Sequence, residues 1–317
     1  MKNKDSYTAE GPSLVSIALC TYNGGAFLQE QLDSLLQQSY TNIEIIAVDD
    51  ASTDGTRSIL EKNASADNRL KVFLNEKNIG YNKNFEKAIS LCSGQYIAIS
   101  DQDDIWDTEK IGKMMRLWPE GAQFIYSLSG SFTGTHFENR TAAPNVVYTP
   151  IDHVLKLVFN SPVHGHACMF KKELVPLCTP FPANIFYDWW MSMHAAAFGT
   201  IGCIPETLTW HRVHENNSSR NITSISDKEE RNEQLRQQCV YFYETFCNKN
   251  ILTGSQKKLL GEYAAILKKM NGKKFSWPML LYVLKNRKLI FHYKKQKPFL
   301  IFSYLKHAYK MAFKGLL

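Results

Sequence analysis

The first hundred residues alternate short β-branched runs with amphipathic helical patterns, and no other feature constrains the fold as strongly. The runs indicate strands at 14–20, 43–50, 70–75 and 95–100. The segments between them space their apolar residues as helices do, at 26–39, 53–60 and 82–92. This alternation predicts an α/β fold with a mostly parallel, doubly wound sheet. A ligand crevice is expected at the carboxyl ends of its strands.

Beyond residue 106 the pattern becomes mixed. We expect a strand and turn at 124–134, a strand leading into a helix at 146–159, a strand then a helix at 164–175, a helix at 188–198 ended by Gly199, and two short strands around Pro205. The remainder, 225–317, is predicted to be helical and basic. The sequence thus divides into a polar N-terminal extension, 1–13, an α/β domain, 14–224, and this C-terminal region, 225–317.

The net charge of +7 is concentrated near the C-terminus of the 317-residue chain. Residues 263–317 hold 13 of the 37 Lys and Arg and none of the 30 Asp and Glu. Lysines interleaved with aromatic residues suit an interfacial helix on anionic lipid. A helical hairpin packed on the α/β domain is the alternative. No nucleic-acid motif accompanies the lysines, so we expect no nucleic-acid partner.

The N-terminal residues do not read as a signal peptide, and no apolar run approaches the roughly 18 residues of a membrane span. The seven cysteines lack metal-type spacing and read as reduced core residues. We therefore expect a cytoplasmic protein that is peripheral on the inner face of the cell membrane.

Polar residues follow each expected strand and should form one rim over the sheet. They are Thr21 to Gly25, Asp49 to Gly55, Asn75 to Gly80, and Asp101 to Asp104. Tyr22, Asp49 and Asp50 have the chemistry that a nucleoside site needs, an aromatic face and acceptors for hydroxyls and an imide. A helix-capping turn is the alternative for Ser52 to Asp54. No glycine-rich phosphate loop is present.

Asp101, Asp103 and Asp104 crowd three carboxylates into four residues at a strand end. Their mutual repulsion suggests a divalent cation, shared with phosphate oxygens, as the missing partner. A calcium-binding EF-hand does not fit, because the loop lacks the required glycine and the glutamate at its twelfth position.

A family resemblance becomes clear over residues 14–217. It rests on three stretches of this sequence, VSIALCTYNGGAFLQEQLDSLLQQSYTNIEIIAVDDASTDGT, NIGYNKNFEKAI and SGQYIAISDQDDIW. These resemble the GT-A (Rossmann-like) nucleotide-sugar domain of family 2 glycosyltransferases, most like bacterial rhamnosyltransferase-type members. The resemblance implies a nucleotide-sugar donor, and it implies Mn²⁺ or Mg²⁺ as cofactor.

The resemblance also implies roles for the residues of the rim. The nucleoside is assigned to Thr21, Tyr22, Asp49 and Asp50, and the metal-bridged diphosphate to Asp101 and Asp103. Asp104 either touches the donor sugar or caps the next helix.

On the acceptor side, the resemblance implies that Asp188 is the catalytic base, which takes the proton of the attacking hydroxyl. A helix N-cap is its alternative role. The stretch Trp210 to Asn217 departs slightly from the family pattern. It places His214 in the metal site and Arg212 near the donor.

Four further residues have two possible roles each. His164 and His166 either contact donor or acceptor or serve in packing, and Trp189 and Trp190 either stack on a sugar or belong to the core.

These observations together predict an inverting glycosyltransferase that acts on a polysaccharide or lipid-linked glycan. One alternative is a nucleotide-sugar-binding scaffold without turnover. The other is a HAD-type phosphotransferase, which Ile105 disfavours because that chemistry requires a threonine or small residue there.

Overall fold

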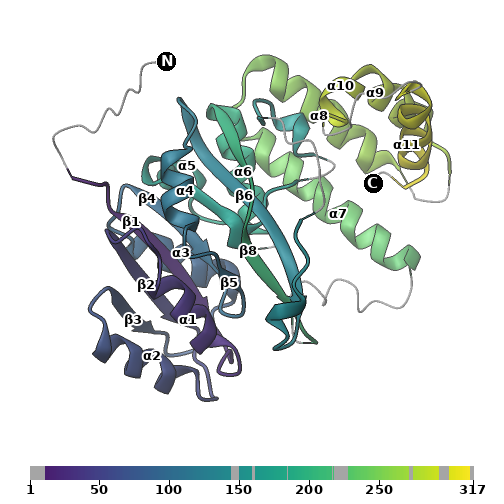
Figure 1. The fold of residues 1–317 in the computed structure, drawn as a ribbon. Coiled ribbons are helices and arrows are strands. Elements are labelled where there is room, and N and C mark those ends of the chain that lie inside the picture. Colours follow the sequence, from purple (N-terminus) through teal and green to yellow (C-terminus); the bar gives the residue numbers. More distant parts are fainter. Residues whose placement is uncertain are drawn as a thin grey trace.

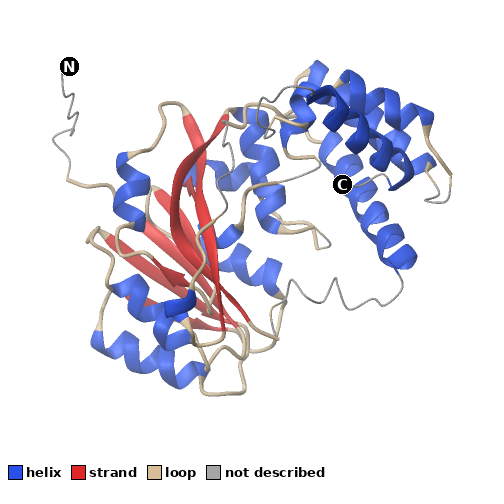
Figure 2. Cartoon of the chain, turned by 45° about the vertical axis from the view of Figure 1, so that its right-hand side comes forward, coloured by secondary structure: helices blue, strands red, loops and turns tan. Residues whose placement is uncertain are grey.

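The computed structural model describes residues 11–143, 150–158, 161–183, 185–215, 217, 228–270, 274–292 and 300–314. The described strands form one eight-stranded sheet in the order β3-β2-β1-β4-β7-β6-β8-β5. Helices cover both of its faces, and a group of helices, α7–α11, gathers on one side (Figures 1 and 2).

Four parallel strands make the N-terminal half of the sheet, and three helices connect them. The strands are β1 (Val15–Thr21), β2 (Ile43–Asp49), β3 (Leu70–Leu74) and β4 (Tyr96–Ser100). The helices are α1 (Leu28–Leu36), α2 (Thr56–Ala66) and α3 (Tyr81–Leu91). Alternate residues of β1 face opposite cores: Ile17 packs with α1 and Ala18 with α3. The doubly wound prediction is confirmed.

The second half of the sheet is mixed. It contains β5 (Ile105–Trp106), β6 (Ala122–Thr133), β7 (Cys168–Lys171) and β8 (Thr200–Val213). Strand β7 runs antiparallel to β4 and β6, whereas β6 and β8 are parallel. Short helices connect these strands, namely α4 (Lys110–Arg116), α5 (Val175–Cys178), and 3-10 turns at Phe137–Asn139, Val154–Lys156, Gly165–Ala167 and Lys172–Leu174. Helix α6 (Tyr187–Phe198) ends at Gly199 as expected.

Two predictions for this half are wrong in detail. Strand β8 does not break at Pro205. Ser127 of β6 pairs with Ile204, and the next pair is Leu128 with Thr207, so the ladder passes over the proline in a bulge. A bulge suits proline because it has no N–H to donate to the ladder. In the predicted strand and helix at 146–159, the described residues show a single bridge at Ile151 and a 3-10 turn; residues 144–149 and 159 lie outside the description.

The described part of the C-terminal region is helical, as predicted. It comprises α7 (Lys228–Cys247), α8 (Gly254–Lys269), α9 (Trp277–Lys285), α10 (Arg287–Ile290) and α11 (Leu300–Lys314). Trp189 of α6 stacks on Phe242 of α7 with ring centroids 4.1 Å apart. Tyr243 donates a hydrogen bond to the carbonyl of Val158 (2.8 Å). The region therefore shares one apolar core with a face of the sheet.

The proposed boundary at residues 224 and 225 lies outside the described part of the chain, as do residues 1–10 of the N-terminal extension. Among the described helices, none has the length and apolar character needed to cross a bilayer.

Candidate functional site

Asp49 organises the loop that follows β2. Its fully buried carboxylate accepts hydrogen bonds from the Thr21 hydroxyl (3.0 Å), from the Ser52 amide (2.9 Å) and hydroxyl, and from Nε of Arg57 (3.1 Å). Both oxygens are thus engaged by the chain itself. In this arrangement Asp49 shapes the rim, and its direct contact with a nucleoside stays a prediction.

Asp50 has a similar role in the loop after β3. Its Oδ1 accepts hydrogen bonds from the Asn75 amide group and the Ile79 N–H (both 2.8 Å), and its Oδ2 accepts one from the Gly80 N–H (2.9 Å). Gly80 has a φ of 85°, a left-handed conformation that glycine adopts without steric cost. The acidic pair therefore holds two loops of the rim together.

The Tyr22 side chain, by contrast, is 48 % exposed at the end of β1. Its ring is available to a flat ligand. The side-chain amide of Gln102 binds the Tyr22 backbone and so connects this loop to the one after β4. No role for Gln102 was predicted from the sequence.

The three carboxylates after β4 differ in exposure. The side chains of Asp101, Asp103 and Asp104 are 37 %, 15 % and 0 % exposed, respectively. Burial, followed by the charges of its two neighbours, raises the pKa of Asp103 to about 6. Burial alone would raise the pKa of Asp104 as well, but His166 and His211 lower it below its ordinary value.

Histidines stand opposite each of these carboxylates. His214 Nε2 lies 2.8 Å from Asp103 Oδ2, and His211 Nδ1 lies 3.0 Å from Asp104 Oδ1. His166 Nδ1 lies 3.6 Å from Asp101 Oδ2 and 3.5 Å from Asp104 Oδ2. The sequence places His214 at the metal site, and the structure adds His166 and His211 opposite Asp101 and Asp104. The crowding of negative charge was the signal that could have predicted these two contacts.

The donor atoms around these carboxylates fit a divalent cation. The predicted set is brought together in part, since Asp103 contacts His214 while Asp101 lies beside His166. A second set, Asp104, His166 and His211, places its ligand atoms within 4.8 Å of one another. Asp104 Oδ2 is buried and has no hydrogen-bond partner among the described residues. Carboxylate and imidazole ligands together suit Mn²⁺, and carboxylates alone suit Mg²⁺.

Asp188 lies half-buried in the first turn of α6. Its oxygens accept hydrogen bonds from the Trp189 N–H (2.7 Å) and the Gly165 N–H (3.2 Å). Gly165 also leaves room for the neighbouring Tyr187 hydroxyl, because a Cβ there would lie 2.2 Å from it. Burial raises the pKa of Asp188, and the nearby charge of Asp101 adds to the effect. The N-cap alternative is wrong, because Phe186 occupies that position.

Arg212 does not face the rim, contrary to the expectation from the sequence. Its side chain is fully buried between the rings of Phe27 and Phe132, at 4.5 and 4.6 Å. The guanidinium donates to the Asp103 carbonyl (2.7 Å), to the Gly134 carbonyl and to Glu30 Oε2 (2.8 Å). In this conformation Arg212 supports the loop of Asp103. Its buried side chain is not accessible to a nucleotide-sugar donor.

Asp104 also differs from both of its expected roles. It neither caps a helix nor lies open to a sugar. Its Oδ1 accepts hydrogen bonds from two residues of β8, the His211 ring (3.0 Å) and the Arg212 N–H (3.1 Å).

The aromatic residues near Asp188 are arranged differently from the sequence interpretation. Trp190 is fully buried and donates to the Cys178 carbonyl (2.7 Å), while Trp189 is stacked on Phe242. The core alternative is therefore the right one for Trp190. The exposed rings are instead those of Tyr81 and Phe186, 46 % and 41 % exposed, with centroids 6.2 Å apart.

Asn82 holds these two rings together. Its side-chain amide donates to the carbonyls of Ile185 (2.6 Å) and Pro182 (3.0 Å), which ties the start of α3 to the segment before α6. The ring pair was not predicted from the sequence, since its members are 105 positions apart and come from separate segments.

A GT-A fold with carboxylates and an exposed aromatic ring at the carboxyl edge of its parallel strands defines the nucleotide-sugar transferase class. The profile of glycosyl transferase family 2 matches residues 16–176, and the chain belongs to that family.

Two relatives and two solved structures illustrate the similarity. An uncharacterized glycosyltransferase of Haemophilus influenzae is 28 % identical over 225 residues, 66 % of this chain and 68 % of that protein. The putative teichuronic acid biosynthesis glycosyltransferase TuaG of Bacillus subtilis is 37 % identical over 121 residues, 38 % of this chain and 46 % of that protein.

The crystal structure of S. aureus TarS 1-349 in complex with UDP-GlcNAc superposes with a TM-score of 0.59 at 20 % identity, covering 89 % of this chain and 79 % of that one. The mannosyltransferase PcManGT from Pyrobaculum calidifontis, in complex with GDP-Man and Mn²⁺, gives a TM-score of 0.55 at 18 % identity, covering 96 % and 86 %. At 20 % and 18 % sequence identity, these two structures establish the GT-A fold of the chain and do not identify its sugar donor or its acceptor.

Proposed function

We propose that this protein is an inverting glycosyltransferase that moves a sugar from a nucleotide-diphosphate donor to a polysaccharide or lipid-linked glycan. One observation carries the proposal. A half-buried carboxylate, Asp188, has a raised pKa and is close enough to Asp101 to feel its charge. Asp101 lies beside His166, which with Asp104 and His211 forms a set of ligands that fits a divalent cation. Such a pairing supplies a base for the acceptor and a charged anchor for the donor.

On the donor side, the nucleoside lies against the exposed ring of Tyr22, in a rim that Thr21, Asp49 and Asp50 keep in shape. Asp101, Asp103 and His214 would hold Mn²⁺ or Mg²⁺. Asp104, His166 and His211 form a second set of possible metal ligands next to them. When bound, the cation neutralises charge on the diphosphate leaving group. Arg212 acts indirectly, by fixing the backbone of Asp103.

On the acceptor side, Asp188 accepts the proton of the acceptor hydroxyl. The hydroxyl oxygen forms a bond to the anomeric carbon as the bond from that carbon to the diphosphate oxygen breaks. A single base on the face opposite the leaving group gives inversion. The exposed ring pair of Tyr81 and Phe186 provides an apolar surface beside Asp188 on which an acceptor sugar can pack.

The identity of the sugar and the acceptor is proposed from the relatives. The sequence resemblance favours rhamnose as the first donor sugar to test. The structural relatives, whose complexes contain UDP-GlcNAc and GDP-Man, add two further candidates. The Bacillus relative is named for teichuronic acid biosynthesis, which supports a cell-surface polysaccharide as acceptor. We place the reaction at the cytoplasmic face of the membrane, where lipid-linked glycans are built.

The test is slow donor hydrolysis by the full chain, measured as nucleotide release from these nucleotide-sugars with Mn²⁺ present. We expect turnover with one donor and its loss on chelation. Asp188→Asn should lower turnover at least about 100-fold while donor binding by calorimetry is kept. Asp33→Asn, an exposed carboxylate change on α1, is the matched control and should be silent.

Other outcomes identify the alternatives. Donor binding without turnover by the unmodified chain would favour the scaffold. Release of inorganic phosphate with a phosphorylated enzyme would favour the HAD-type chemistry. Full turnover in Asp188→Asn would remove the proposed base.

A further inference from the structure

Helix α11 carries two different apolar faces. Ala308, Met311 and Ala312 are buried against the rest of the protein. A second set, separated by three or four residues and therefore on one side of the helix, remains exposed: Phe302 (64 %), Leu305 (42 %), Tyr309 (57 %) and Phe313 (38 %). We call this second set the α11 stripe. A row of four large, exposed apolar side chains is typical of a surface that contacts a protein or a membrane.

Aromatic residues preceding and beginning α9 extend the α11 stripe. The Phe275 ring lies 5.0 Å from Trp277, 5.3 Å from Tyr309 and 5.2 Å from Phe313, measured between centroids. Trp277 is 65 % exposed. The Ser276 N–H donates to the Ala312 carbonyl (2.8 Å), which fixes this segment against α11. The exposed aromatic surface is therefore built from two chain segments that are bonded together.

The charged residues of the segment that forms this surface all have one sign. Lys306, Lys310 and Lys314 follow one another at four-residue intervals along one flank of the α11 stripe. The whole segment 263–317 contains 13 Lys and Arg and no acidic residue. An apolar stripe with aromatic residues and a basic flank matches the interface of an anionic bilayer, where rings sit among acyl chains and lysines reach the headgroups.

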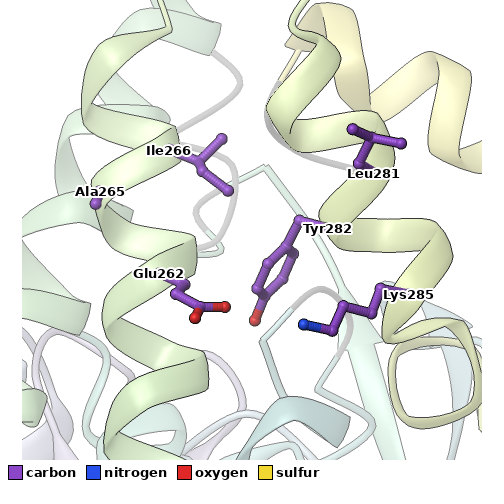
Figure 3. A pocket seen from close by; sticks show the side chains of 6 residues that line it. All are labelled: Glu262, Ala265, Ile266, Leu281, Tyr282 and Lys285. Carbon is purple, nitrogen blue, oxygen red and sulfur yellow. The ribbon is translucent and has the colours of Figure 1, made fainter.

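The surface of α9 that faces α8 also exposes an apolar side chain. A groove of about 380 Å³ lies between α8 and α9, lined by Glu262, Ala265, Ile266, Leu281, Tyr282 and Lys285 (Figure 3). Leu281 is 64 % exposed at this groove. Glu262 precedes the acid-free segment.

We propose that the α11 stripe, together with Phe275 and Trp277, rests in the headgroup region of an anionic lipid bilayer. The inference deepens the proposed function, and rests on it in one respect: a lipid-linked acceptor lies in that same bilayer. The contact uses none of the residues assigned to donor or base, so binding to lipid and turnover can be measured separately.

The test is cosedimentation of the full chain with vesicles of phosphatidylcholine alone and of phosphatidylcholine with phosphatidylglycerol. We expect binding to the anionic vesicles that weakens with salt. Phe302→Ser/Leu305→Ser should reduce the partition coefficient at least about tenfold, because two exposed apolar side chains lose their transfer into the interface. Leu117→Ser/Phe198→Ser removes an exposed leucine and an exposed phenylalanine elsewhere, 43 % and 46 % exposed, and should leave partition unchanged.

Charge is tested by Lys306→Glu/Lys310→Glu, for which we expect a loss of about tenfold or more on anionic vesicles. Lys62→Glu/Arg116→Glu changes the net charge equally on the α/β domain and serves as its control. Thermal melts confirm that each variant is folded. Equal loss in both charge-changed proteins would mean that net charge alone drives binding, and would overturn the assigned surface.

Two other occupants of the surface would also overturn the proposal. One is a second copy of the chain, revealed by a dimer in light scattering that Phe302→Ser/Leu305→Ser dissociates. The other is single-stranded nucleic acid, revealed by RNA that competes fully with anionic vesicles. Donor hydrolysis without vesicles should be the same in all four double variants. Loss of lipid binding would therefore leave the proposed transferase activity intact, and absence of donor hydrolysis would leave the lipid contact intact.

Discussion

The side-chain amide of Gln102 is paired with the backbone of Tyr22, accepting a hydrogen bond from its N–H (2.8 Å) and donating one to its carbonyl (3.1 Å). Gln102 belongs to the loop after β4 and Tyr22 to the loop after β1, and these two strands are neighbours in the sheet. The two residues are 80 positions apart in the sequence. Gly24 leaves room for this amide, because a Cβ there would lie 2.1 Å from Gln102 Oε1. The loop proposed to hold the nucleoside is thus fastened to the loop proposed to hold the diphosphate.

Gln102→Ala should therefore weaken donor binding more than it weakens the fold. Two hydrogen bonds of about 1 kcal/mol each position the loops, so we expect the Kd of the donor to rise about tenfold or more. Gly24→Ala should have a similar effect by displacing the amide. Calorimetric titration with donor and Mn²⁺ measures both. Gln29→Ala, which removes an amide contact with Asn63 on α2, is the control, and donor affinity equal to that of the unmodified chain in Gln102→Ala would refute the coupling.

Arg212 is expected to matter for stability. Arg212→Lys keeps the charge but cannot reproduce the three-way contact with Asp103, Gly134 and Glu30. We expect the free energy of unfolding in urea to fall by about 3 kcal/mol, because buried acceptors lose their donor. Arg140→Lys, which removes a guanidinium from an exposed aromatic contact, should change it by less than about 1 kcal/mol. Unchanged stability together with weaker donor binding would restore the original donor-contact hypothesis.

Glu44 should make the fold sensitive to acid. Burial by itself would raise its pKa, but hydrogen bonds from Lys71, Ser16 and Ser93 lower it to about 2. A lowered folded-state pKa stabilises the protein above the unfolded value of about 4.3, and this contribution is lost as the pH falls toward 2.

At pH 7 we accordingly expect Glu44→Gln to lower the free energy of unfolding by about 2–3 kcal/mol. The difference between the two proteins should shrink steadily in denaturant titrations from about pH 5 to about pH 2. Glu206→Gln removes the carboxylate of a partly exposed ion pair with Lys113 and should show little of this dependence. A difference that stays constant with pH would mean that the Glu44 contacts do not favour the ionised form.

The strands and helices of the N-terminal half were predictable because each responds to local physics. Strands β1, β2 and β4 are apolar runs buried on both faces, and the helices between them have one apolar side. Their order alone placed the polar rim at one edge. The bulge at Pro205 was not predictable in the same way, since it depends on the register between β6 and β8.

The site was predictable as a set of positions and less so as a set of contacts. Asp101 and Asp103 lie where the sequence placed them, but the partners of the carboxylates come from distant segments: His166 from before β7, and His211 and His214 from the end of β8. From the sequence, Arg212 is predicted to be a surface cation, because the residues next to it in the chain do not indicate that Phe27 and Phe132 enclose it. Such contacts are fixed by tertiary packing, which overrides local pattern.

Tyr81 and Phe186 should affect the acceptor rather than the donor. Tyr81→Ala and Phe186→Ala each remove one of the two exposed rings beside Asp188, so we expect the KM for acceptor to rise about fivefold to tenfold. Donor hydrolysis without acceptor should stay near the unmodified rate. Tyr241→Ala, which removes an equally exposed ring on α7, is the control. A larger change in donor affinity than in acceptor KM would place the rings on the donor side.

The raised pKa of Asp188 leads to two measurable consequences with opposite signs. Burial, with a contribution from the charge of Asp101, disfavours the ionised carboxylate. A base must be ionised to act, so kcat/KM should rise with pH through a midpoint above the ordinary aspartate value of about 3.9.

The same shift should make the folded protein less stable as Asp188 ionises. Between the unfolded pKa and the raised folded pKa the native state holds the proton more tightly, so stability falls as the pH rises through that window. Asp188→Asn cannot titrate. Its melting temperature relative to the unmodified chain should therefore climb as the pH rises through the range above about 4, while Asp33→Asn shows no such trend. A flat difference across that range would show that Asp188 ionises at no cost, and burial would then contribute nothing to tuning the base.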